Sequence, residues 1–397
     1  MKLPIYMDYH ATTPVDPRVL EVMLPFFTEK FGNPASKNHK FGWIAEEALE
    51  SARTTIAKTL NIESTEIIFT SGATESNNLA IKGVAEIFHP KGNQIITAMT
   101  EHKSVIDSCM KLQKNGFEII FIPVDHNGSI DSDDLRKAIT DRTILVTLMA
   151  ANNEIGTLHN LNEIGSICRE KDILFHTDAT QAIGKTLLNV GDLPIDLMSI
   201  SGHKIYGPKG IGALYIRDRK PKIRLNPQID GGGHEKGLRS GTINVPGAVG
   251  LARAIEIAGM EMESESSRLR TYRDLMWKEF TDQLEDVYLN GHPTDRLPNN
   301  LNVSFLNVED SALIMSINEI AVSTGSACST LDPSPSHVLK ALKLPSSRIN
   351  SAIRFGLGRF TTQEEVEYAI NRVVENVKKL RAKTSLVYKN KYSTSLK

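Results

Sequence analysis

Residues 199–216 read SISGHKIYGPKGIGALYI, an apolar run that ends in Ser-Gly-His-Lys, a turn rich in Gly and Pro, and a second apolar run. Short apolar runs bounded by such turns are typical of β-strands. Lys204 therefore stands at the end of a predicted strand, among small residues. A lysine in that position is most often a solvated loop charge. The alternative is that the Lys204 amine takes part in a chemical reaction, and this reading needs support from the rest of the sequence.

Short β-branched runs alternate with longer segments of helical period through most of the chain. Helical signals such as Asp16, a predicted N-cap before Pro17, lie between most of these runs. Strands separated by helices pair in parallel, so we predict an α/β fold with a mostly parallel seven-stranded sheet flanked by helices. The seven predicted strands are EIIFTSG (66–72), QIITAM (94–99), FEIIFIPV (117–124), TILVTLMAA (143–151), ILFHTDA (173–179), DLMSISG (196–202) and GALYI (212–216).

The pattern changes after residue 245, where a long charged helix is predicted to run to about residue 284. Mixed strands and helices follow, and a chain of 397 residues exceeds what one hydrophobic core usually supports. The later strand candidates are NLNVSFL (300–306), IAVSTG (320–325) and AIRFGLG (352–358). We predict a large domain of residues 15–260, a smaller α+β domain of residues 1–14 and 261–382, and a Lys-rich tail of residues 383–397 that frays or docks a partner.

The composition narrows the class of protein. The 46 basic and 47 acidic side chains give a net charge of −1, which favours neither nucleic acid nor a membrane surface as the main partner. No apolar run approaches the roughly 18 residues that span a bilayer, and the first residues resemble no signal or transit peptide. Cys109, Cys168 and Cys328 are far apart and form no C-x-x-C, which argues against a disulfide framework or a zinc site. We therefore expect a cytoplasmic protein.

Polar residues follow five of the predicted strands at the point where each strand ends. In open α/β sheets, ligands bind beyond the carboxyl ends of the strands. Each group alone could cap a helix or stabilise a loop, but five such groups in succession at one edge of the predicted sheet indicate a ligand site. The Gly turn before Ala73 and Thr74 leads into a helix whose N-terminus suits a phosphate. The five groups are Ser71-Gly72-Ala73-Thr74, Thr100-Glu101-His102, Asn152-Asn153-Glu154, Asp178-Ala179-Thr180-Gln181 and Ser201-Gly202-His203-Lys204.

Two nucleotide-binding motifs are disfavoured by spacing. No G-x-G-x-x-G follows a predicted strand, and Gly207 is followed by Pro208 where a P-loop needs Lys and Ser or Thr. The residues match instead the needs of pyridoxal phosphate: an amine for its aldehyde, a carboxylate for its ring nitrogen, and a helix N-terminus with hydroxyls for its phosphate. Lys204 and Asp178, on neighbouring strands, can reach opposite ends of one such ring.

Seven ordered motifs resemble the cysteine desulfurases, in particular the iron–sulfur-assembly type within the class-V aminotransferase superfamily. The likeness runs from about residue 2 to residue 382 and implies the pyridoxal-phosphate transferase fold of type I. It also implies a homodimer with its active site at the subunit interface, and conversion of L-cysteine to L-alanine with the sulfur kept as an enzyme persulfide. The motifs are TSGATESNNLAIKG, TEHKSV, NNEIG, DATQAIGK, SGHKIYGPKGIGALY, GGGHEKGLRSGT and STGSACS.

The resemblance also implies roles for single residues. Lys204 would form the Schiff base, Asp178 would partner the ring nitrogen, and His102 would stack on the ring and move protons. Arg354 would grip the substrate carboxylate, although a strand-edge charge is the alternative reading of this arginine. The other implied contacts are Gln181 to the phenolic oxygen, Thr74, Ser201 and His203 to the phosphate, Thr242 to the phosphate of the other subunit, Ala73 to the cofactor, and Asn153 to cofactor and substrate.

Cys328 distinguishes a desulfurase from other enzymes of this superfamily. Cys109 and Cys168 lie among apolar residues of helical stretches and are predicted to be structural. Cys328 lies in STGSACSTLDPSPS (323–336), a composition typical of an exposed loop. The resemblance implies that its thiolate takes the sulfur and passes it to an iron–sulfur scaffold protein and other acceptors, for cluster assembly and tRNA thiolation, and allows it to ligate a cluster transiently. We expect His102 to take the thiol proton.

Two alternatives stay open at this stage. A selenocysteine lyase or a class-V aminotransferase would share most motifs, although amino transfer needs no loop thiol. A non-catalytic scaffold that keeps pyridoxal phosphate as a structural ligand is the second alternative, against which the intact Lys204, His102, Asp178 and Cys328 argue.

Overall fold

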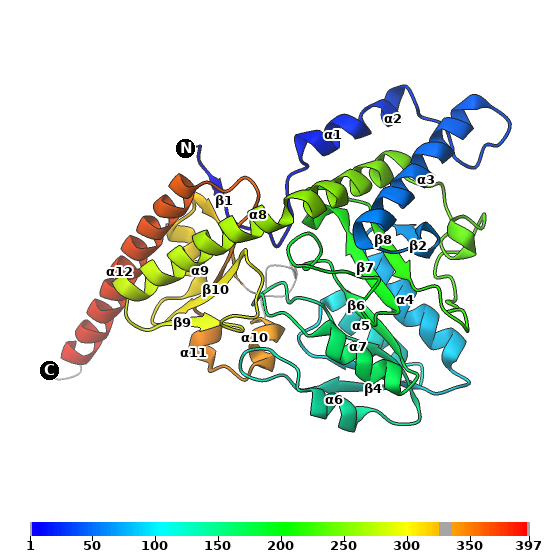
Figure 1. Cartoon of the computed structure of the whole chain (residues 1–397). Coiled ribbons are helices and arrows are strands. Elements are labelled where there is room, and N and C mark those ends of the chain that lie inside the picture. Colours follow the sequence, from blue (N-terminus) through cyan, green and yellow to red (C-terminus); the bar gives the residue numbers. More distant parts are fainter. Residues whose placement is uncertain (1, 325–334, 395–397) are drawn as a thin grey trace.

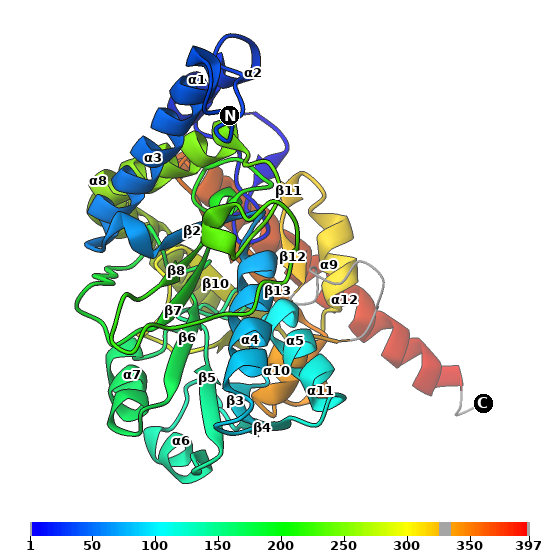
Figure 2. The same cartoon turned by 90° about the vertical axis from the view of Figure 1, so that its right-hand side faces the viewer.

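The computed structural model describes residues 2–324 and 335–394, with side chains described up to residue 383. Two parts lie side by side and are joined along one long helix, α8 (Val245–Gln283) (Figures 1 and 2). Within the described residues, the larger part is built on a seven-stranded sheet in the order β2-β8-β7-β6-β5-β3-β4. Its strands are β2 (Ile67–Thr70), β3 (Gln94–Ala98), β4 (Glu118–Ile122), β5 (Thr143–Thr147), β6 (Leu174–Asp178), β7 (Leu197–Ser201) and β8 (Gly212–Ile216).

The pairing in this sheet is mostly parallel. Neighbouring strands from β4 to β7 run parallel, and β8 runs antiparallel to both β7 and β2. Each strand lies inside its predicted run, so the predicted α/β fold with a mostly parallel seven-stranded sheet is confirmed. Strands buried on both faces need no polar alternation, which is why continuous apolar runs predicted them.

Helices cover both faces of the sheet, and successive residues of a strand face opposite helices. Ile95 packs in one cluster with α4 (Ala73–Phe88) and α5 (Lys103–Gln113). Ile96 packs in the other cluster with α3 (Lys40–Leu60) and the first half of α8. Because side chains alternate between the two faces of a strand, neighbouring residues belong to two different apolar clusters, one on each face of the sheet.

The smaller part holds an antiparallel sheet and a pair of short parallel strands. The sheet has the order β12-β13-β10-β9, with β9 (Val287–Asn290), β10 (Asn300–Phe305), β12 (Ser323–Thr324) and β13 (Ala352–Gly356). The pair is β1 (Ile5–Tyr6) with β11 (Ile320–Ala321). The run IAVSTG, predicted as one strand, is therefore two short strands in two sheets, and β9 was not predicted. The second half of α8 packs here against α12 (Gln363–Thr394), so the boundary predicted at residue 260 falls inside α8 and stays a prediction.

Two helical segments differ from the prediction. The helical segment that follows the predicted N-cap Asp16 is divided into α1 (Pro17–Met23) and α2 (Pro25–Thr28), because Pro25 has no N–H for the hydrogen-bond ladder. Helix α12 continues to Thr394, into the segment that we expected to fray or dock. The remaining helices are α6 (Ser132–Ala138), α7 (Leu161–Glu170), α9 (Asp310–Ser316), α10 (His337–Ala341), α11 (Ser346–Ile349) and the short 3₁₀ turns η1 (Ser64–Glu66), η2 (Gly202–Lys204) and η3 (Glu235–Gly237).

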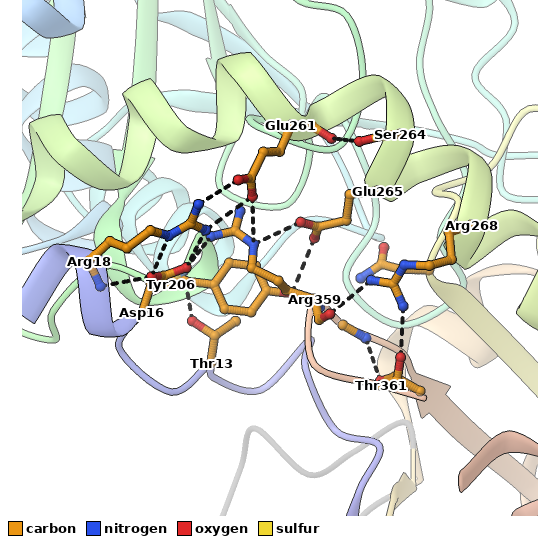
Figure 3. Close-up of polar contacts among 12 residues, drawn as sticks. Thr13, Asp16, Arg18, Tyr206, Glu261, Ser264, Glu265, Arg268, Arg359 and Thr361 are labelled. Carbon is orange, nitrogen blue, oxygen red and sulfur yellow. Dashed lines mark hydrogen bonds and ion pairs between the residues drawn. The ribbon is translucent and has the colours of Figure 1, made fainter. Parts of the chain in front are cut away.

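A charged cluster ties the two parts together beside α8 (Figure 3). Arg359, in the loop after β13, donates to Asp16 at 2.8 Å and to Glu265 of α8 at 2.8 Å. Its guanidinium lies over the ring of Tyr206 at 4.2 Å, and its backbone N–H donates to the Tyr206 hydroxyl. Since Tyr206 follows Lys204 by two residues, this cluster connects the smaller part to the turn that carries the lysine.

Candidate active site

A cavity of about 550 Å³ lies at the carboxyl ends of the parallel strands. Nine residues predicted to bind cofactor or substrate line it together, although they come from five separate strand ends. These are Ala73, Thr74, His102, Asn153, Asp178, Gln181, Ser201, His203 and Lys204. The predicted convergence of polar residues at one edge of the sheet is therefore present.

Lys204 ends the 3₁₀ turn η2 directly after β7. Its Nζ donates to the main-chain oxygens of His10 at 2.6 Å and Ala11 at 2.7 Å. The N-terminal segment thus forms one wall of the cavity, which Ala11 and Thr12 line. Sequence reasoning missed this wall, because the contact joins residues more than 190 positions apart.

Asp178, the last residue of β6, is held at both carboxylate oxygens. Oδ1 accepts from the backbone N–H of Thr180 at 3.0 Å, and Oδ2 accepts from the Asn77 amide at 2.8 Å. Both neighbours donate, so the carboxylate is kept as an acceptor in a buried setting. That is the state needed to partner a protonated ring nitrogen.

Gln181 lines the cavity with its amide orientation fixed. Nε2 donates to the main-chain oxygen of His10 at 3.0 Å, and Oε1 accepts from Nζ of the buried Lys185 at 3.2 Å. Burial lowers the pKa of Lys185 to about 7, with the nearby Lys204 adding to the effect. Lys185 was not predicted as part of the site. It does not line the cavity, but it donates to Gln181, which does.

His102 is the N-cap residue of α5, and its ring is held through Nδ1. Nδ1 accepts from the backbone N–H of Ser104 at 3.1 Å and lies 2.8 Å from the Ser104 hydroxyl. Burial is the largest cause that lowers the pKa of His102, and Asp178 opposes it. The ring is therefore neutral at neutral pH.

The part of the cavity that is lined by the start of α4 suits an anion. Helix α4 begins at Ala73 with Gly72 at φ +148, a conformation that favours glycine, and the backbone donors of its first turn have no cap side chain. His203 lies beside Thr12, with Nδ1 3.1 Å from the hydroxyl oxygen. Burial, followed by the charge of Lys204, lowers the pKa of His203 to about 4.

Two predicted residues of the described chain, Arg354 and Thr242, are not among those that line the cavity. Arg354 on β13 is fully buried, and its guanidinium donates to Asp8 at 2.8 Å and to the main-chain oxygen of Asn153 at 2.9 Å. Thr242 is exposed and does not line the cavity of its own chain. Cys328 lies outside the described residues. The roles of all three stay predictions.

The other two cysteines match their predicted structural role. Cys109 and Cys168 are buried free thiols. Burial raises the pKa of both thiols to about 12, so neither is a thiolate at neutral pH. Among residues 2–324 and 335–394, no group of three or more His, Cys, Asp or Glu could hold a metal ion. Over the same described residues, no helix has the length and apolar character needed to cross a bilayer.

Glu154 follows Asn153 in the chain and is buried. Its Oε2 accepts from the hydroxyl of Ser336, the N-cap residue of α10, at 2.5 Å. Burial raises the pKa of Glu154 to about 7, while the Ser336 bond and the Arg354 charge oppose that shift. At pH 6 the folded chain therefore keeps a proton that an unfolded chain has lost.

Glu154 should make stability fall with rising pH. Between the unfolded pKa near 4.5 and the folded pKa of about 7, the folded state binds more protons, so the free energy of unfolding decreases as pH rises and then levels. The slope is up to about 1.4 kcal/mol per pH unit for one proton. Glu154→Gln keeps an oxygen for Ser336 and should remove that slope in urea unfolding from pH 5 to pH 8. The exposed control Glu21→Gln should keep it. Equal slopes in Glu154→Gln and wild type would contradict this assignment.

Comparison with known proteins identifies the family. The family model "Aminotransferase class-V" matches residues 5–369. "Cysteine desulfurase IscS" of Rickettsia rickettsii (strain Iowa) is 52% identical over 386 residues, 97% of this chain and 94% of that protein. The protein of the same name from Anaeromyxobacter sp. (strain Fw109-5) is also 52% identical over 386 residues, 97% of this chain and 95% of that protein. The chain belongs to the cysteine desulfurases. Enzymes of this family depend on pyridoxal phosphate, so the predicted family and cofactor are confirmed.

Solved structures share the fold. A NifS-like protein superposes with a TM-score of 0.87 at 39% identity, covering 94% of this chain and 98% of that one. A structure named "SspA in complex with cysteine" gives a TM-score of 0.79 at 37% identity, covering 90% of this chain and all of that one. The desulfurase therefore has the type I fold of pyridoxal-phosphate enzymes, as predicted.

The cavity of this desulfurase fits the cofactor on its own chemistry. Its donors gather at the α4 end and its buried carboxylate, Asp178, stands at β6, with the Lys204 amine also in the lining. Thr180 also lines the cavity, and its buried hydroxyl has no hydrogen-bond partner among the described residues. An orphaned buried hydroxyl at that place is ready for a ligand.

Proposed function

We propose that this desulfurase converts L-cysteine to L-alanine and that Cys328 receives the sulfur. The thiolate of Cys328 would attack the sulfur of bound cysteine, forming an S–S bond as the C–S bond breaks. The carbon that loses sulfur would then gain a proton, which gives alanine and a persulfide. The observation that carries this proposal is the meeting of Lys204, His102 and Asp178 in one cavity. The solved relative named as a complex with cysteine supports the substrate.

The cofactor, when bound, supplies an electron sink for charge that develops at the substrate α-carbon. Around it we propose that Asp178 holds the ring nitrogen, that Gln181 donates to the phenolic oxygen, and that Lys204 joins the aldehyde. Ala73, Thr74, Ser201 and His203 would bind the phosphate, with Thr242 supplied by the other subunit. His102 would stack on the ring and move protons, including that of the Cys328 thiol.

Substrate orientation would come from Asn153 and Arg354. The Arg354 guanidinium already donates to Asp8 and to the Asn153 carbonyl, and its Nε has no partner among the described residues. A bound carboxylate would therefore have to share the arginine with Asp8. Between turnovers, when no substrate is bound, the bond to Asp8 would keep the guanidinium paired, because an unpaired buried charge destabilises the fold.

Turnover with and without Cys328 tests the proposal. Wild-type protein loaded with cofactor and given L-cysteine should release alanine and, with a reductant, sulfide. Cys328→Ser should keep the cofactor absorbance and lose at least about 100-fold in sulfide release. Alanine production that is unchanged in Cys328→Ser would favour a selenocysteine lyase or an aminotransferase. No turnover in either protein would favour a non-catalytic scaffold.

A homodimer is the second part of the proposal. Six apolar side chains on α1 and α2, on the residues that follow each of these helices, and at the start of α3 are each 45% to 62% exposed, and we call them the N-terminal apolar patch: Leu20, Leu24, Phe27, Phe31, Phe41 and Trp43. Figure 1 shows these elements at one end of the molecule. Exposed apolar patches of this kind mark protein interfaces. The exposure of Thr242, away from its own cavity, agrees with a role in the cavity of a second copy.

Charges placed in the patch should dissociate the dimer. We expect wild type to elute with the mass of two chains in size exclusion with light scattering, and Phe31→Asp/Phe41→Asp to elute as one chain at micromolar concentration. Leu187→Asp, at a leucine 83% exposed outside the patch, is the matched control and should stay dimeric. A patch variant that remains a dimer would place the interface elsewhere.

The remaining parts of the proposal concern the cell compartment of the enzyme and the proteins that accept its sulfur. We propose a cytoplasmic enzyme whose persulfide passes to an iron–sulfur scaffold protein and to acceptors for tRNA thiolation, with transient ligation of a cluster at Cys328. The name shared by the relatives, IscS, supports this assignment.

A further inference from the structure

The side-chain amide of Asn77 lies between Asp178, which lines the cavity at the end of β6, and Ser104 of α5. Its Nδ2 donates to Oδ2 of Asp178 at 2.8 Å and to Oγ of Ser104 at 2.8 Å. Asn77 is fully buried in the first turns of α4. An amide NH₂ has two hydrogens, and these two bonds use both.

The orientation of this amide is fixed by Asp178. The Asp178 carboxylate already accepts from the Thr180 N–H, and an ionised carboxylate can only accept. Turning the Asn77 amide over would set its oxygen against that carboxylate. In the orientation found, Oδ1 of Asn77 is buried without a partner among the described residues. A buried acceptor without a hydrogen bond destabilises the folded state, so the two hydrogen bonds that Asn77 donates must contribute more free energy than the unpaired Oδ1 costs.

The direction of the next hydrogen bond follows from the first. Since the Ser104 hydroxyl oxygen accepts from Asn77, its own hydrogen is left for Nδ1 of His102 at 2.8 Å. The backbone N–H of Ser104 donates to the same Nδ1 at 3.1 Å. A nitrogen that accepts two hydrogen bonds carries no hydrogen. In a neutral ring the proton is therefore on Nε2.

The charged groups around His102 keep the ring neutral. Burial is the largest cause that lowers its pKa. Lys204 and His337 lower it further, while Asp178 and Asp107 raise it. The neutral form predominates at neutral pH, so the tautomer decides what the ring can do.

We propose that Asn77 and Ser104 are positioning residues that hold His102 with its proton on Nε2, so that the resting enzyme presents a proton donor to the cavity. The proposal rests on the role given to His102 under the proposed function and adds a constraint to it. A ring in this state can accept a proton at Nε2 only if it gives up the one it carries, and loss of that proton alone would leave an imidazolate anion. Donation of the Nε2 proton to a bound substrate group and removal of the Cys328 proton would therefore be coupled, so that the ring stays neutral.

Histidine ¹⁵N NMR of the cofactor-free protein tests the tautomer directly. The His102 signals are those that disappear in His102→Gln. We expect wild type to show the Nε2–H pattern at pH 7.5. Ser104→Ala removes one donor to the neutral ring, and Asn77→Ala lets the Ser104 hydroxyl turn and accept from Nδ1–H. Both changes should raise the pKa of His102 by about one unit, a tenfold shift in its protonation equilibrium.

Two neighbouring variants serve as matched controls. Asn78→Ala removes an amide that donates to the carbonyl of Thr74 on the exposed side of the same helix. Ser108→Ala removes a hydroxyl that donates to the carbonyl of Ser104 and leaves the Ser104 side chain in place. Both should keep the wild-type tautomer and pKa.

A proton on Nδ1 in the wild type would overturn the proposal, and so would an unchanged His102 pKa in both Asn77→Ala and Ser104→Ala. If Asn77→Ala does not fold, Ser104→Ala decides alone. Because the measurement needs neither cofactor nor turnover, its result is independent of the desulfurase assay. A chain without desulfurase activity could still show the expected tautomer.

Discussion

Replacing Lys204 with alanine is expected to lower the turnover of L-cysteine by roughly 10⁴-fold or more, at the upper end of what one acid–base group contributes. The same change should remove the absorbance that the cofactor gains on joining the amine. The reason is geometric, since Lys204 supplies an amine to the cavity within reach of Asp178, His102 and the α4 N-terminus. The overall fold should survive, because Lys204 is only half-buried at the end of a turn.

The control for this variant is another lysine of the same cavity. Lys209 lines the cavity and is exposed, so Lys209→Ala should change turnover by less than about tenfold, as expected for a solvated charge. Absorbance spectra of the reconstituted proteins and alanine release measure both effects, and circular dichroism checks the fold. If Lys204→Ala kept both the bound-cofactor spectrum and sulfur release, the assigned role of this amine would be wrong.

The sheet could be predicted because its strands are continuous apolar runs. Residues such as Ile95 and Ile96 are both buried, one on each face, so the sequence needs no alternation to mark the strand. Strand β9 carries the opposite pattern. Tyr288 is 40% exposed and its neighbours are half-buried, which leaves no apolar run to detect.

The inner surface of the site could be predicted, and its support could not. Polar residues at strand ends converge through the topology of the sheet, which the order of elements already implies. The contacts behind them depend on tertiary packing. Asn77 reaches Asp178 across 101 positions, and Arg354 reaches Asp8 across 346, so no local pattern records either contact. The resemblance to a family implied roles for the strand-end residues and for Arg354, but not the contact of Asn77 with Asp178 or that of Arg354 with Asp8.

Replacing Arg359 with methionine is expected to destabilise the folded chain by about 3 to 5 kcal/mol, the usual cost of removing one partner of a buried ion pair. The Arg359 side chain is 8% exposed, and the carboxylates of Asp16 and Glu265 beside it are 2% and 12% exposed (Figure 3). Methionine keeps the packing volume over Tyr206 and removes the charge. Glu265 would then keep the long bond to the Tyr206 hydroxyl, at 3.4 Å, and Asp16 would keep the more exposed Arg18. The negative charge of the cluster would then exceed its positive charge in a setting that water does not reach well.

Arg18 provides a control within the same cluster. It also binds Asp16, at 2.8 Å, but its side chain is 43% exposed. Exposed ion pairs contribute about 1 kcal/mol or less, so Arg18→Met should shift the urea midpoint by a small fraction of the Arg359→Met shift. Each variant removes one positive charge, and the two arginines differ in burial. A difference between their urea midpoints, measured at one protein concentration, therefore reports the effect of burial. Equal shifts would show that burial of Arg359 is not what makes the cluster stabilising. A larger shift for Arg359→Met, accompanied by weaker cofactor binding, would show that this cluster also holds Tyr206 and the turn that carries Lys204 in place, since Asp16 and Thr13 bind the main chain of Tyr206 directly.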